Sequence, residues 1–152
     1  MGKFFFYGII ITLTALFLLI LGKKQFGIRH IFLMMSYSLY NLIFELIYGE
    51  IFGLYYYIER THSLIYIIIA SVFLYPVIAV LYVSFLPGRK KALWFTLGAI
   101  VIMLFLEMAS LNTRTIVLTG WKVIPWSVIA YIVSFVFINI INNSLLRVLP
   151  DP

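Results

Sequence analysis

Two acidic residues, Glu45 and Glu107, lie inside long apolar stretches that carry no other charge. A carboxylate in the interior of a bilayer costs about 2.5–3.5 kcal/mol on insertion scales, so it requires a polar partner, a water-filled pocket or a functional role. Two carboxylates in one pocket of low dielectric would share a proton or attract a cation. Glu45 and Glu107 are therefore the first candidates for a binding site.

Other polar residues share a helical face with these carboxylates. Asn41 precedes Glu45 by four residues and Tyr48 follows it by three, while Ser110 follows Glu107 by three. These spacings place the residues on one side of a helix, and a polar side within a membrane must face protein or water. The predicted ligand-binding residues are Glu45, Glu107, Asn41, Tyr48 and Ser110.

Two further stretches carry shorter polar faces. Ser127, Tyr131 and Ser134 recur at helical spacing near the C-terminus, and Ser71 and Tyr75 do so in the third apolar stretch. We expect such residues to form hydrogen bonds between helices.

Two basic residues beyond Glu107 are possible ion-pair partners for the carboxylates. Arg114 lies about two turns after Glu107 if the helix continues, and Lys122 enters the last stretch from the same side. A long basic side chain can reach into a bundle while its stem covers apolar surface. The carboxylates then form either a salt-bridged structural contact or a ligand pocket, and both interpretations stay open.

Composition places these residues in a membrane protein. The chain has 152 residues, 64% of them hydrophobic and 11% charged, and its mean hydropathy is +1.13. A soluble domain of this length needs more polar surface. Because a helix crosses a bilayer with about 20 apolar residues, we predict one all-α transmembrane bundle with short joints. Its five spans are 4–21, 31–49, 64–86, 92–111 and 123–141.

Basic residues mark the joints on one side of this bundle. The joint 22–30 contains three of them, as does the joint after the third span. Basic joints stay in the cytoplasm, so the N-terminus is predicted outside and the C-terminus inside. Glu45 and Glu107 then lie at matching depth, about 21–23 Å from the cytoplasmic ends of two parallel spans. They meet if these helices are neighbours.

Two local features modify the spans. Pro76 falls in the middle of the third span, where a proline removes a helical hydrogen bond and predicts a kink. Tyr55, Tyr56 and Tyr57 fall in the longest joint, and their rings are predicted to lie in the headgroup layer.

Several classes of chemistry have no support in the sequence. The chain has no cysteine, and His30 and His62 fall on opposite sides of the predicted membrane, so no metal site is expected. No nucleophile elbow, phosphate-binding loop or dinucleotide motif occurs, and we expect neither a catalytic residue nor a cofactor. The net charge of +6 comes from basic residues at the ends of apolar runs, which indicates membrane topology and no nucleic-acid partner.

A series of short motifs covers most of the chain. They are a basic joint after the first span, Tyr40-Asn41, His62, Tyr75-Pro76, Leu81-Tyr82, Pro87, Glu107, Gly120-Trp121 and Trp126-Ser127. Together they resemble an uncharacterised family of small multi-pass membrane proteins of spore-forming bacteria. Many members of that family carry an acid a few residues before the Tyr-Asn pair, where this chain has Tyr37. Since the family has no established activity, the resemblance implies the fold and no particular chemistry.

We therefore predict a non-catalytic integral protein of the cell membrane with a polar site in the outer half of its bundle. One alternative is a small transporter or channel subunit that binds a cation, a proton or an amine solute through Glu45 and Glu107. Another is a membrane-embedded enzyme that acts on lipid. The expected partners are the bilayer and either a second copy or another membrane subunit, because Gly8, Thr12 and Ala15 offer a packing face on the first span.

Overall fold

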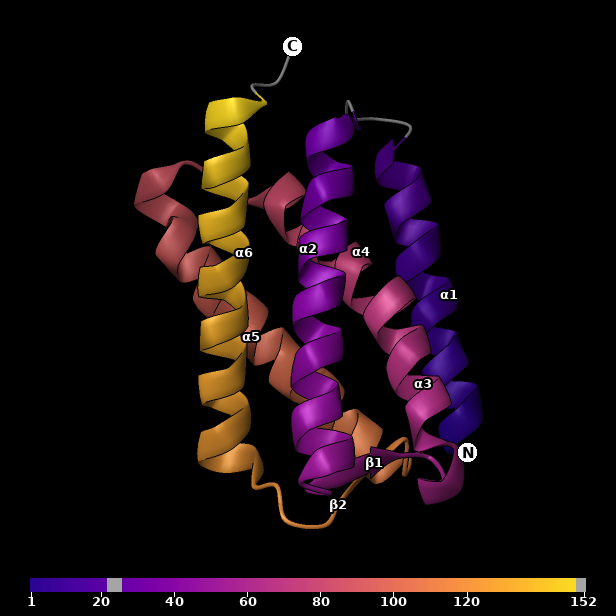
Figure 1. Cartoon of the computed structure of the whole chain (residues 1–152). Helices are drawn as coiled ribbons and strands as arrows, with labels where there is room; N and C mark the ends of the chain where they lie inside the picture. Colours follow the sequence, from indigo (N-terminus) through magenta and orange to yellow (C-terminus); the bar gives the residue numbers. More distant parts are fainter. Residues whose placement is uncertain (22–25, 150–152) are drawn as a thin grey trace.

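A computed structural model shows a bundle of long helices, which confirms the predicted all-α fold (Figure 1). The structure describes residues 1–21 and 26–149, without the side chains of 89 and 90. Within these residues, five helical segments are long and apolar enough to cross a membrane. The segments are Gly2–Leu21, Ile28–Ile51, Arg60–Phe85, Lys91–Asn112 and Val123–Val148.

The helical segments contain regular helices and wider turns. The α-helices are α1 (Gly2–Leu21), α2 (Ile28–Glu45), α3 (Ser63–Ile69), α4 (Tyr75–Phe85), α5 (Arg89–Asn112) and α6 (Val128–Val148). The shorter elements are the π-helical turns η1 (Leu46–Ile51), η3 (Ala70–Leu74) and η4 (Val123–Ser127), and the 3-10 turn η2 (Arg60–His62). The last segment continues past the predicted end at 141, because Asn142 and Asn143 stay helical although they lower the local hydropathy.

Polarity is inverted relative to a soluble protein. Trp94 and Phe105 are 75% and 72% exposed, whereas Glu45 and Glu107 are buried. An apolar exterior around polar interior groups suits a lipid environment, in which buried polar groups must find partners within the bundle. The chain is therefore a membrane-integral helical bundle.

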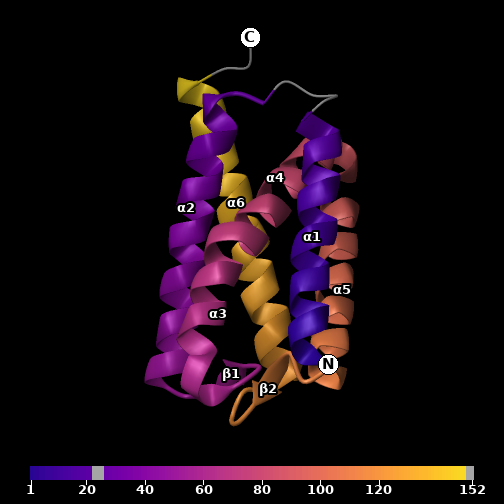
Figure 2. The same ribbon diagram turned by 90° about the vertical axis from the view of Figure 1, so that its right-hand side faces the viewer.

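The third membrane segment changes direction between α3 and α4 (Figure 2). The π-helical turn η3 lies at this change, and Tyr75 closes it by donating its N–H to the Ala70 carbonyl. Pro76 follows in the first turn of α4. A proline has no N–H for the preceding turn, and the wider π-helical turn accommodates this loss while aiming Tyr75 into the bundle.

A small antiparallel sheet lies at the end of the bundle where α1 begins (Figure 2). Strand β1 (Tyr55–Tyr57) pairs with β2 (Ile116–Leu118), with Tyr56 opposite Val117. The all-helical prediction missed this sheet, although aromatic and β-branched residues favour strands. Side chains alternate along a strand, so Tyr55 and Tyr57 are buried. Their rings thus pack against the protein, and their predicted place at headgroup depth stays a prediction.

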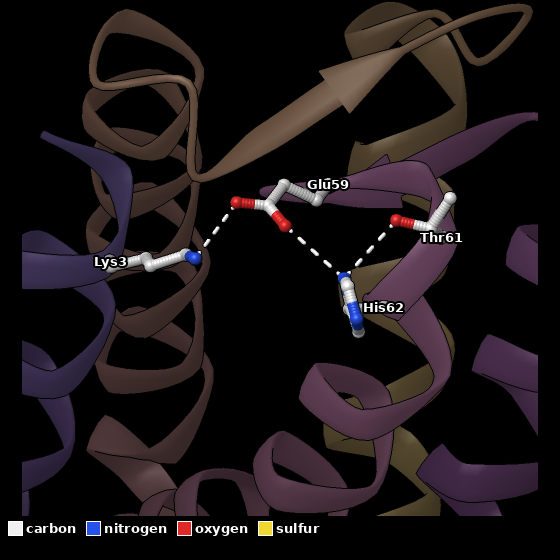
Figure 3. A network of polar contacts seen from close by, with 4 residues as sticks. All are labelled: Lys3, Glu59, Thr61 and His62. Carbon is white, nitrogen blue, oxygen red and sulfur yellow. Dashed lines mark hydrogen bonds and ion pairs between the residues drawn. The ribbon is translucent and has the colours of Figure 1, made fainter.

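Polar contacts hold the start of α1 against the same end of the bundle. The Thr115 hydroxyl donates to the Gly2 carbonyl at 3.1 Å. Lys3 forms an ion pair of 2.8 Å with Glu59, which also lies 3.2 Å from His62 (Figure 3). The basic joints at the opposite end fall partly outside the described residues, since Lys23 and Lys24 lie between 22 and 25.

Candidate ligand-binding cavity

Glu45 and Glu107 line one cavity of about 70 Å³. It lies beside the sheet, whose strands β1 and β2 form part of its wall together with residues of α2, α4, α5 and α6. Helix α6 packs against both α2 and α5, and these two helices carry the two carboxylates. Asn41, also predicted as a site residue, lines the same cavity.

The Glu45 carboxylate is bound through one of its two oxygens. Glu45 is the last residue of α2, directly before η1. Its Oε1 accepts hydrogen bonds from the Tyr75 hydroxyl at 2.8 Å and from the Tyr57 hydroxyl at 3.0 Å. These two hydroxyls lie 3.0 Å from each other. A strand residue and a residue after the η3 turn thus meet at one carboxylate oxygen.

The second oxygen of Glu45 is different. Among the residues that the structure describes, Glu45 Oε2 is buried and has no hydrogen-bond partner. The Tyr55 phenol lies near enough to interact with the Glu45 carboxyl group, but its geometry relative to Oε2 is not that of a hydrogen bond. Burial, and then the Glu45 charge, raise the pKa of both Tyr55 and Tyr57. Both phenols therefore stay neutral around this carboxylate.

The Glu107 carboxylate is bound through both oxygens. Ser127 donates to Oε1 at 2.6 Å, and Tyr131 donates to Oε2 at 2.9 Å. Ser127 itself accepts a hydrogen bond of 2.9 Å from the Trp121 indole N–H. Both oxygens of Glu107 thus accept a hydrogen bond from a hydroxyl group. Trp121, Ser127 and Glu107 form a chain of hydrogen bonds, in which Trp121 donates to Ser127 and Ser127 donates to the carboxylate.

The structure places the predicted cationic partners away from this cavity. Arg114 and Lys122 are exposed, and within the described part of the chain neither Glu45 nor Glu107 has an ion pair. Helix α5 ends at Asn112 instead of continuing for two turns past Glu107, and Arg114 then adopts φ +56 in the turn toward β2. Neutral hydroxyl groups take the place that we expected basic side chains to fill.

Two other predicted site residues do not line this cavity. Tyr48 packs its ring against Phe44 and Trp121. Ser110 donates to the Leu106 carbonyl at 2.8 Å within its own helix. It lines a second cavity of about 60 Å³.

Sequence reasoning did not include four hydroxyl donors among the site residues. Ser127 and Tyr131 share a helical face, and that spacing was the available signal. Tyr75 precedes Pro76 within an apolar span, whereas Tyr57 lies in a joint, where no helical periodicity marks it. Only the strand pairing brings Tyr57 to Glu45.

The π-helical turns η1 and η3 and the kinked segment η4, whose Ile124 is not helical, each adjoin a residue of this hydrogen-bonded cluster. Glu45 directly precedes η1, Tyr75 directly follows η3, and Ser127 ends η4. Such turns occur often at functional sites, because the extra residue redirects a side chain.

A metal centre has little support in this arrangement. Over residues 1–21 and 26–149, no group of three or more His, Cys, Asp or Glu side chains is placed to hold a metal ion. The cavity instead combines two carboxylates with hydroxyl and aromatic groups. Its chemistry suits the binding of positive charge.

Comparison of the chain with protein-family models, curated proteins and solved structures gives no match. The resemblance to membrane proteins of spore-forming bacteria therefore stays a prediction.

Proposed function

We propose that this protein is an integral component of the cell membrane that binds a cationic ligand in the Glu45–Glu107 cavity, without catalysing a reaction. The observation that carries the proposal is Glu45, a residue of the cavity wall whose buried Oε2 has no partner among the described residues. A buried carboxylate oxygen without a hydrogen bond is costly. A bound cation would remove that cost.

The second carboxylate strengthens this proposal. Glu107 lines the same cavity, and opposite charge at short range is worth far more in a low dielectric than in water. The surrounding hydroxyl groups orient both carboxylates, but they are neutral and do not supply the positive charge that would balance the carboxylates. A cationic ligand would supply it.

A small transporter or channel subunit is the second candidate function. The observation that favours it is the second cavity, which shares Tyr57, Tyr75, Glu107 and Tyr131 with the first. Glu107 therefore lies between two spaces, and a cation held by Glu45 has a further site beside it. Cation transport across the membrane of liposomes that contain this protein and no other would distinguish transport from binding alone.

The orientation and assembly are also proposals. The basic joints support an outside N-terminus, which puts the cavity in the outer half of the membrane. Since the chain has no cysteine, Lys122→Cys should react with an impermeant reagent in intact cells, and Gly88→Cys should react only after lysis. The reverse pattern overturns the orientation. The face of Gly8, Thr12 and Ala15 is exposed on α1, which is compatible with packing against a second copy or another subunit.

The binding proposal is tested by the thermal stability of the purified protein in detergent at neutral pH, with the chloride salts of several monovalent cations. A ligand that binds only the folded state raises the melting temperature in a concentration-dependent way. We expect at least one cation to stabilise the wild type and the surface variant Glu59→Gln, but not Glu45→Gln. Glu107→Gln provides a second carboxylate variant.

Two results would contradict the proposal. One is a folded wild type whose melting temperature responds to none of the cations. The other is an equal response from wild type and Glu45→Gln, which would place the bound cation elsewhere.

A further inference from the structure

The cavity distinguishes between kinds of cation through the number of oxygens that it leaves free. Glu45 Oε1 and both oxygens of Glu107 already accept hydrogen bonds from hydroxyl groups. Of the oxygens on these two carboxylates, Glu45 Oε2 is left without a partner among the described residues. Ca²⁺ and Mg²⁺ take about six or more oxygen ligands, whereas one N–H donor needs a single free acceptor.

The remaining wall of the cavity suits the apolar part of a ligand. Most of its lining is apolar, and it includes the rings of Phe44, Tyr55 and Trp121 together with Leu118. Phe44 and Trp121 pack edge to face with ring centroids 6.0 Å apart. Aromatic walls attract organic ammonium groups through their ring faces and also bury alkyl groups.

The size of the cavity limits the ligand. The cavity of about 70 Å³ is well above the roughly 10–15 Å³ that one water requires. A small organic ammonium is therefore the size of ligand that we test.

We infer that the cavity binds a small protonated alkylamine, which donates an N–H to Glu45 Oε2 and packs its carbon atoms against Phe44 and Trp121. This inference rests on the proposed cation-binding function and names the chemical class of its ligand. The amine is either a free solute or the ethanolamine headgroup of a lipid, since both present the same ammonium group.

The test is a titration of the purified protein in detergent, at neutral pH, with n-butylammonium, tetramethylammonium, sodium and potassium chlorides. Binding is measured by calorimetry and by the melting temperature. We expect n-butylammonium to bind more tightly than tetramethylammonium, because only the primary amine has N–H donors for Oε2. Sodium and potassium should bind more weakly than n-butylammonium, since they cannot use the apolar wall.

Two substitutions test the two halves of the contact. Glu45→Gln should weaken n-butylammonium binding by about tenfold or more, the loss expected for a hydrogen bond to a charged group. Phe44→Leu should weaken it by about two- to fivefold, the range of a cation–ring contact. The matched control is Phe52→Leu, because Phe52 is 62% exposed and should leave binding unchanged.

The outcomes separate this inference from the proposed function. If sodium or potassium binds as tightly as n-butylammonium in a Glu45-dependent way, the amine inference is wrong and the cation site stands. Equal binding of tetramethylammonium and n-butylammonium overturns the hydrogen bond to Oε2. If no cation binds to the folded wild type, both proposals fail. Should Glu45→Gln not fold, the order of the four cations and the Phe44→Leu variant still decide the result.

A last measurement identifies the source of the amine. The titration with n-butylammonium is repeated in nanodiscs of phosphatidylethanolamine and in nanodiscs of phosphatidylcholine, which has the same net charge but no ammonium N–H, so the two surfaces attract cations alike. Weaker apparent binding in phosphatidylethanolamine indicates competition by the lipid headgroup, and equal binding in both lipids indicates a free amine. Either result agrees with an alkylamine site.

Discussion

The Tyr75 hydroxyl donates a hydrogen bond of 2.8 Å to Glu45 Oε1, and this contact joins two π-helical turns. Tyr75 directly follows η3, and Glu45 directly precedes η1. The kink before Pro76 and the end of α2 are therefore coupled through one buried carboxylate oxygen. The other oxygen of Glu45, Oε2, is buried without a hydrogen-bond partner among the described residues, and Glu45 lines the cavity.

Replacement of Tyr75 tests this coupling. Tyr75→Phe removes the hydroxyl that contacts both Glu45 and Tyr57, and should destabilise the protein by about 1–2 kcal/mol. Thermal unfolding in detergent measures the effect. Tyr56→Phe is the matched control, since Tyr56 lies in β1 between two buried tyrosines but does not line the cavity. An equal loss in both variants would show that the hydroxyl of Tyr75 has no special role.

Replacement of Ser127 tests the second carboxylate. Ser127→Ala leaves the Trp121 indole N–H without its acceptor and Glu107 Oε1 without its donor. A buried carboxylate oxygen and a partly buried indole N–H then lose a partner, so we expect a destabilisation of about 1–3 kcal/mol and a change in Trp121 fluorescence. Ser144→Ala, at an exposed position of α6, should change neither quantity. If Ser127→Ala unfolds at the same temperature as the wild type, the chain of hydrogen bonds from Trp121 through Ser127 to Glu107 does not stabilise the protein.

Replacement of Gly2 tests the docking of α1. A Cβ at Gly2 would lie 2.8 Å from the backbone carbonyl oxygen of Arg114, a contact that requires the backbone to move. Gly2→Ala should therefore destabilise the bundle by about 1–3 kcal/mol, as overpacking does. At Gly8 an added Cβ has no neighbour within 4 Å, and Gly8→Ala should be neutral or slightly stabilising because alanine favours helix. Unfolding in detergent compares the two, and similar melting temperatures would argue against this docking contact.

Acidification tests the ion pair between α1 and the joint before α3. Lys3, and to a smaller extent His62, hold the pKa of the Glu59 carboxyl below its ordinary value. A lowered pKa means that Glu59 stabilises the folded state above the pKa of the unfolded chain. This contribution is lost as the pH falls through the lowered pKa.

The stability difference between wild type and Glu59→Gln should therefore favour the wild type at about pH 6 and shrink steadily as the pH is lowered past the ordinary glutamate pKa of about 4.3. The effect should be small and sensitive to salt, because both charges are exposed. Melting curves across this range measure the difference. A difference that persists at the acidic end would assign the effect of the substitution to something other than the charge of Glu59.

Hydropathy along the chain is sufficient for the membrane-integral fold. Each of the five apolar runs is long enough to cross a bilayer, and the cost of burying charge in lipid makes Glu45 and Glu107 conspicuous without any structure. Helical spacing also marks the face that carries Asn41 and the face that carries Tyr131. These are local properties, and local periodicity is what a sequence displays most directly.

Tertiary packing alone decided which groups meet these carboxylates. The partners of Glu45 come from Tyr57 and Tyr75, which are 12 and 30 residues away. Strand pairing and a π-helical turn bring them together, and neither follows from the period of an α-helix. The end of α5 at Asn112 likewise keeps Arg114 away from Glu107. Because such contacts depend on where a helix stops and how a joint folds back, the hydroxyl donors and the unpartnered Oε2 of Glu45 emerged only from the packed bundle.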